Sequence, residues 1–200
     1  MALFDFEVAS TKVPGLLRWM GRILVVMCFA FLPFLNRLFA QESVAREYQI
    51  KAVFLYNFTQ FVQWPEEAFS DTASPLVIGV LGKDPFGSFL DETVKGEVVN
   101  NHQITIERYG TVEEVKNCHV LFIVDANDGE IRRALEHLKK LPVLTVSDTD
   151  GFVRMGGMIR LFNDGGRIRL RVNVDAATEA NLVISSKLLR LADIRTQKNN

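Results

Sequence analysis

The sequence is poor in cysteine and histidine. Its 200 residues include two cysteines, Cys28 and Cys118, and three histidines. If the N-terminal segment that carries Cys28 is removed, Cys118 has no partner for an intrachain disulfide. Only Cys118 and His119 are close enough in sequence to suggest a metal site, but adjacent residues of a strand point to opposite faces and do not bind one ion together. The sequence therefore predicts neither a metal site nor a cofactor.

Positive charge is not in excess either. Lysine and arginine number 23, aspartate and glutamate number 24, and the formal net charge is -1. No basic stripe with interleaved aromatic residues follows the chain, so the composition argues against nucleic-acid binding. The glycines at 79, 82 and 87 fit neither the P-loop nor the dinucleotide-binding spacing, and no nucleophile elbow accompanies the histidines. These absences predict that the protein is not an enzyme.

Long hydrophobic runs are also missing. The apolar run over residues 23–35 has 13 residues, whereas a membrane-spanning helix needs about 20. Arg18 and Arg22 precede it, and a positive flank before a short apolar run predicts a secretory signal peptide. We expect cleavage after Ala40, which leaves a periplasmic domain over residues 41–195 and a frayed tail at 196–200. An uncleaved membrane anchor is the alternative.

The richest apolar stretch follows the predicted cleavage site. Residues 47–65 combine helical spacing with an unusually wide apolar surface, which predicts a helix packed against the core on more than one side. Pro65 is expected to end this helix, because proline lacks an N–H and disfavours the helical region for the residue before it. The residues expected on one face are Ile50, Phe54, Phe58, Phe61 and Val62. The residues expected to widen it are Val53, Leu55, Tyr56 and Trp64.

Strands and helices alternate over the next hundred residues. The predicted strands are 76–81, 103–109, 119–125 and 142–148, and the predicted helices between them are 86–94, 111–117 and 128–141. This alternation predicts an α/β fold, a three-layer sandwich with a mostly parallel sheet and helices on both faces. Near the C-terminus, the Asp-Gly pair at 164–165 between two strand-like runs predicts an antiparallel hairpin. The arginines that alternate along the second run, over residues 167–174, favour an edge strand.

Two sets of residues are candidates for function. Gly82 follows a predicted parallel strand, Asp125 and Asp148 are each the last residue of one, and the carboxyl edge of such a sheet is where ligands bind. For the two carboxylates, helix capping is the competing interpretation. The second set is expected to bind a partner protein and consists of Trp64, Phe69, Phe152, Met155 and Met158.

The reasons for the second set differ. The last three residues lie in the glycine-rich connection over 148–160, where methionine suits an adaptable binding surface. The competing interpretation is a loop that folds back over the sheet. The first two lie at the exit of the predicted helix.

Several segments together resemble the YfiR family of exported proteins, the domain of unknown function DUF4154. They are 51–65, 75–87, 118–123, 142–148, 151–152, 156–159 and 184–192. The resemblance implies a compact periplasmic α/β domain without catalytic activity. The best-known member represses a membrane-bound diguanylate cyclase by binding its periplasmic sensor region, and so lowers cyclic di-GMP. That member is a dimer and is released by an outer-membrane lipoprotein. It also carries disulfides, whereas Cys118 of this chain has no partner once the N-terminal segment is removed.

The function expected from the sequence is therefore regulatory. We predict an exported protein that binds the periplasmic region of a membrane-bound diguanylate cyclase or sensor kinase. The alternative is a periplasmic small-ligand-binding domain that uses the cleft near Gly82, Asp125 and Asp148.

Overall fold

The computed structural model describes residues 42–124 and 126–195. The predicted signal peptide, the predicted frayed tail and Asp125 lie outside the described residues. The chain divides into two compact units, Met1–Val44 and Ala45–Asn200, and the whole sheet belongs to the second. In the described part of the chain, no helix combines the length and apolar character needed to cross a membrane.

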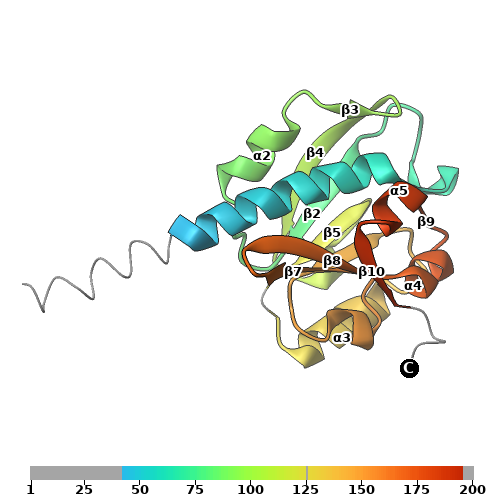
Figure 1. Ribbon diagram of the computed structural model, residues 1–200. Helices are drawn as coiled ribbons and strands as arrows, with labels where there is room; N and C mark the ends of the chain where they lie inside the picture. Colours follow the sequence, from blue (N-terminus) through green and yellow to red (C-terminus); the bar gives the residue numbers. More distant parts are fainter. Residues whose placement is uncertain (1–41, 125, 196–200) are drawn as a thin grey trace, which may run out of the picture. The chain divides into compact units, whose positions relative to one another are not determined.

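The second unit is built on an eight-stranded sheet with the order β10-β8-β7-β6-β5-β2-β4-β3 (Figure 1). Its strands are β2 (Leu76–Leu81), β3 (Val98–Val99), β4 (His102–Tyr109), β5 (Val120–Ile123), β6 (Leu144–Ser147), β7 (Ile159–Asp164), β8 (Arg167–Asn173) and β10 (Ala192–Arg195). The pairs from β4 through β7 are parallel, and β7 pairs with β8 as an antiparallel hairpin. The mostly parallel sheet and the C-terminal hairpin are thus confirmed.

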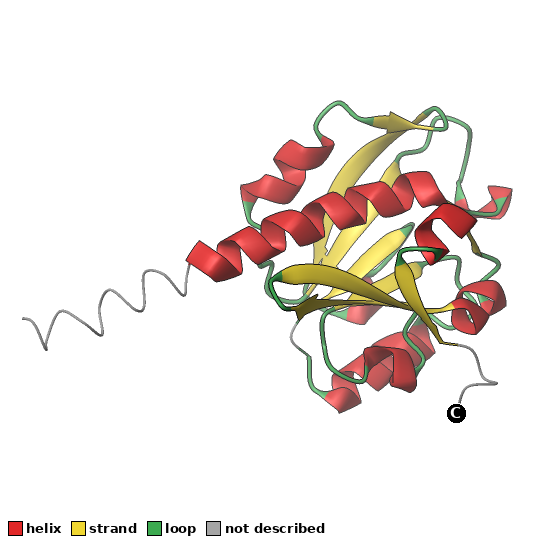
Figure 2. Cartoon of the chain, viewed as in Figure 1, coloured by secondary structure: helices red, strands yellow, loops and turns green. Residues whose placement is uncertain are grey.

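Helices cover both faces of this sheet (Figure 2). They are the N-terminal helix (residues 42–61), α2 (Ser88–Val94), α3 (Asp128–His137), α4 (Val174–Glu179) and α5 (Ser186–Leu189), with 3-10 turns η1 (Glu66–Ala68), η2 (Val112–Glu114) and η3 (Phe152–Met155). One core packs the sheet against the N-terminal helix, α2 and α5, and the other packs it against α3, η2 and η3. Two separate cores on one sheet confirm the predicted three-layer sandwich.

The N-terminal helix differs from its prediction in both its end and its buried face. It ends at residue 61, and β1 (Val62–Gln63) then pairs with β9 (Val183–Ile184) in a separate two-stranded sheet. Ala52, Leu55 and Phe58 are fully buried. Ile50 and Val53 are 40% and 43% exposed, so the prediction that they pack into the core is wrong. The buried face of the helix also includes the polar residues Lys51 and Thr59, so the spacing of apolar residues alone does not identify it.

The hairpin forms as predicted, but its second strand is not an edge. Gly165 and Gly166 adopt φ of 59° and 82°, the positive values that a two-residue type I′ turn needs at both central positions. β10 lies parallel beside β8, with Ala192 opposite Leu170. Arg171 on β8 hydrogen-bonds Asp193 on β10 at 3.4 Å. Arg171 of β8 is therefore paired with a residue of a neighbouring strand, which a local pattern does not reveal.

Candidate functional site

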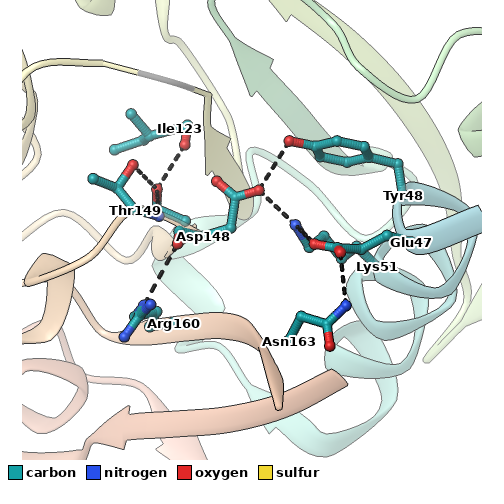
Figure 3. A network of polar contacts seen from close by, with 9 residues as sticks. Glu47, Tyr48, Lys51, Ile123, Asp148, Thr149, Arg160 and Asn163 are labelled. Atoms are coloured by element: carbon teal, nitrogen blue, oxygen red, sulfur yellow. Dashed lines mark hydrogen bonds and ion pairs between the residues drawn. The ribbon is translucent and has the colours of Figure 1, made fainter. Parts of the chain in front are cut away.

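A polar network joins the N-terminal helix to the carboxyl edge of the sheet (Figure 3). Asp148 directly follows β6, and its Oδ2 accepts hydrogen bonds from Tyr48 Oη at 3.0 Å and from Lys51 Nζ at 2.6 Å. Lys51 Nζ also pairs with Glu47 Oε1 one helical turn earlier, at 2.7 Å. Lys51 follows Tyr48 by three positions and Glu47 by four, so its side chain is next to both on the helix surface.

Lys51 is the centre of this network because its side chain is only 2% exposed. A buried ammonium group is tolerated only when charges and hydrogen bonds compensate it. Two carboxylates supply this compensation, and the Nζ atom also lies 4.3 Å from the centroid of the Tyr48 ring, in a cation–π contact. The enclosed amine is suited to fixing the helix on the sheet.

The network continues into β7. Burial alone would raise the pKa of Glu47, but hydrogen bonds from Asn163 Nδ2, at 2.9 Å, and from Lys51 outweigh this effect and hold the pKa below its ordinary value. Arg160 donates to the Asp148 carbonyl oxygen at 3.5 Å and forms an ion pair with Asp150. These contacts fix the backbone around Asp148.

A second cluster consists of stacked aromatic side chains next to the start of β5. The Phe69 ring lies between the imidazoles of His102 and His119, with centroid distances of 3.9 and 4.4 Å. His119 Nδ1 accepts a hydrogen bond from the Val77 N–H at 3.0 Å, so the ring proton belongs on Nε2, which donates to the Ala68 carbonyl at 3.1 Å. Both ring nitrogens of the neutral imidazole are therefore hydrogen-bonded.

Folding should become less favourable at mildly acidic pH because of His119. Burial, together with the nearby His102, lowers the pKa of His119 to about 4, against an unfolded value of 6.5. Between these values the unfolded chain binds a proton that the folded chain does not, so stability falls as pH falls. We expect the free energy of unfolding in urea to drop by about 2 kcal/mol between pH 7 and pH 5 from this group.

The control for this pH effect is His119→Gln, which removes the titrating group. The variant should be less stable than the wild type at pH 7, because it loses a matched hydrogen-bonding ring, yet it should lose less stability on going to pH 5. Equal losses in both proteins would show that other groups carry the pH dependence.

The five residues predicted to bind a partner are not brought together. Phe152 is 0% exposed in the core beneath α3, and Met158 is buried in the other core. Gly157 lies so close to Phe152 that a Cβ there would be 2.2 Å from the ring, so the glycine-rich connection is packed tightly. The competing interpretation of this connection, a loop folded back over the sheet, accounts for both buried residues.

The remaining three of these residues keep some exposed surface. Trp64 and Phe69 are half-buried beside His119, and the Trp64 indole N–H donates to the His119 carbonyl at 3.2 Å. Met155 is half-buried at the end of η3. That these three side chains contact a partner stays a prediction.

The predicted ligand cleft is divided. Gly82, at the end of β2, lines a cavity of about 400 Å³ together with residues of η2 and α3. Asp148 lines a different hollow, of about 640 Å³, beside Tyr48. Lys83 borders both, and Asp125 lies outside the described residues.

Among the described residues, no group of three His, Cys, Asp or Glu side chains is arranged to hold a metal ion. Cys118 is buried, and burial raises the pKa of its thiol to about 12, which disfavours the nucleophilic thiolate. Sequence reasoning missed Lys51, although a lysine within an otherwise apolar helical stretch is a signal that could have drawn attention to it.

The family model described as YfiR/HmsC-like (DUF4154) matches residues 48–193. The chain belongs to the YfiR/HmsC-like family. Membership confirms the resemblance seen in the sequence and points to a periplasmic, regulatory and non-catalytic role in cyclic di-GMP signalling. The match begins at Tyr48, inside the polar network, and ends within β10.

Other comparisons add little to this assignment. One solved structure, the crystal structure of a conserved domain protein from Vibrio cholerae O1 biovar El Tor str. N16961, is similar with 15% sequence identity and a TM-score of 0.42. The similarity covers 60% of this YfiR/HmsC-like chain and 54% of that chain, about half its length. At this level the likeness carries no functional argument. No curated protein matches the sequence.

Proposed function

We propose that this YfiR/HmsC-like protein is an exported regulator that binds the periplasmic region of a membrane-bound signalling protein and represses a diguanylate cyclase. The supporting observation is the family match over residues 48–193, which spans nearly the whole described domain. The proposal includes the features that the family resemblance implies, namely a dimer and release by an outer-membrane lipoprotein.

The outward face of the N-terminal helix is the surface that we propose for this contact. Ile50 and Val53 project from it with exposed apolar side chains, and Phe54, half-buried, lies on the same side of the helix. Exposed apolar side chains grouped on one face are typical of interaction sites. The ion pair between the buried Lys51 and Asp148 anchors the helix to the sheet beneath this face.

Deleting the gene should raise cellular cyclic di-GMP, and wild-type protein should restore the lower level. The variant Ile50→Glu/Val53→Glu should fail to restore it, because two carboxylates would have to be buried in the contact. The nucleotide is measured in cell extracts, and the exported protein is quantified alongside it.

The matched control is Val98→Glu, an exposed valine on the short strand β3, which should restore repression like the wild type. An unchanged cyclic di-GMP level on deletion would contradict the proposed function. Full repression by the double variant would contradict the proposed surface and leave the function standing.

A further inference from the structure

The sheet has a topological switch point between β2 and β5. From β2 the chain proceeds to β4 on one side, and from β5 it proceeds through β6 and β7 on the other. In open α/β sheets, the connections after two such strands leave in opposite directions and open a crevice at their carboxyl ends, where ligands bind. This chain has a cavity of about 400 Å³ at that position, within the size range of small-molecule sites.

The floor of the cavity is apolar. Leu81 and Ile123 reach it from the ends of β2 and β5, Val112 from η2 and Ala134 from α3, and all four side chains are buried. At the mouth, Gly82 has φ of 101°, and a Cβ there would lie 3.4 Å from the Val124 carbonyl oxygen. Glycine is therefore required by the backbone, and its missing side chain leaves the mouth open. This lining suits the apolar body of a small molecule.

Most charged groups around the rim are already engaged within the protein. Arg133 forms an ion pair with Glu113. Glu130 closes the capping box of α3 by accepting a hydrogen bond from the Asn127 N–H at 3.0 Å. Glu113 and Glu130, the two carboxylates that line the cavity among the described residues, are thus paired with donors, which reduces their repulsion of an approaching anion.

Lys83 is different. It is exposed at the rim, and no ion pair joins it to any other residue in the described parts of the chain. Its neighbour Asp84 is held by Arg108 at 2.7 Å and is not available to it. Lys83 therefore offers a positive charge at the mouth of an apolar cavity.

We propose that this cavity binds a small carboxylic acid with an apolar body, whose carboxylate lies at Lys83. The body fills the space over Leu81, Val112 and Ala134, and the acid group stays at the rim in contact with the ammonium group. The site belongs to the isolated domain and is independent of the partner proposed above.

Thermal unfolding of the purified protein with phenylacetate and hexanoate tests this assignment. The matched probes are phenylacetamide and hexanamide, which keep the shape and lack the charge. At tenfold excess over the Kd, we expect an acid to raise Tm by about 3–5 °C, and its amide to raise it less. Lys83→Glu should weaken acid binding at least about tenfold and remove the preference over the amide.

Two further variants make the result specific. Ala134→Leu fills the cavity from α3 and should abolish the response to acid and amide alike. Lys95→Glu changes another exposed lysine, at the end of α2, and should respond like the wild type. If Ala134→Leu does not fold, the amide chemical shifts of Gly82 and Val112 on titration with phenylacetate take its place, and both should move.

The assignment would be overturned by three results. Any one of them is sufficient: no stabilisation by either acid at millimolar concentration, equal stabilisation by acid and amide, or a response that neither Lys83→Glu nor Ala134→Leu alters. In the last case the acid binds elsewhere on the protein.

Discussion

Replacing Lys51 by methionine should lower the free energy of unfolding by about 3 kcal/mol. The substitution keeps a long unbranched side chain but removes the charge, and it leaves Glu47 and Asp148 facing an apolar group and each other. Breaking a buried ion pair by removing one partner typically costs about 3–5 kcal/mol. We place this case at the lower end, because both carboxylates keep some contact with solvent. Urea unfolding followed by circular dichroism measures the loss.

Lys139→Met is the matched control for this prediction. Lys139 forms an ion pair with Glu136 at 3.8 Å, and both side chains are exposed, so its loss should change stability by no more than about 0.5 kcal/mol. Adding Asp148→Leu to Lys51→Met removes one of the abandoned carboxylates and should recover part of the loss. If Lys51→Met costs no more than the control, the network does not fix the helix as described.

Truncating Phe152 to alanine should cost about 3–5 kcal/mol of stability. The ring is completely buried in the core beneath α3, and the surrounding backbone is fitted to it, as the close approach of Gly157 shows. The loss is the sum of the favourable transfer free energy of the deleted ring and the cost of the cavity that remains. Equilibrium unfolding in urea again gives the value.

This prediction separates two interpretations of Phe152. A core residue loses stability on truncation, whereas a partner-facing residue keeps its stability and loses binding alone. Leu191→Ala, at an exposed leucine just before β10, should stay within about 0.5 kcal/mol of the wild type. A similarly small change for Phe152→Ala would return this residue to the set of partner-binding candidates.

The parts of the fold that local patterns specify could be predicted from the sequence. The strands β2 and β5 are unbroken apolar runs, and they are buried on both faces of a parallel sheet. β6 is equally buried but includes Thr145 and Ser147. Thr111 and Glu114 have the spacing of a capping box, and Glu114 accepts a hydrogen bond from the Thr111 N–H at 3.3 Å, although only the 3-10 turn η2 follows. In these places a few neighbouring residues are sufficient to determine the conformation.

What was missed depends on residues distant in sequence. Lys51 and Asp148 are 97 positions apart, and nothing near either one indicates the pairing. A lysine on the buried side of the N-terminal helix also rotates the apparent apolar face away from the true one, which is why Ile50 was misplaced. β10 is four residues long and is defined by its pairing with β8, so its own sequence carries a weak signal.

The single thiol described in the domain, Cys118, bears on the proposed export of the protein. Cys118 Sγ lies in the core and contacts the Val120 carbonyl oxygen at 3.2 Å. An oxidising compartment promotes intermolecular crosslinks between chains whose thiols are exposed. Native packing thus shields the chain from covalent aggregation, and reversible unfolding in vitro requires a reductant. A variant that loosens the core would be trapped as crosslinked material, so its yield after export would fall further than its equilibrium stability suggests.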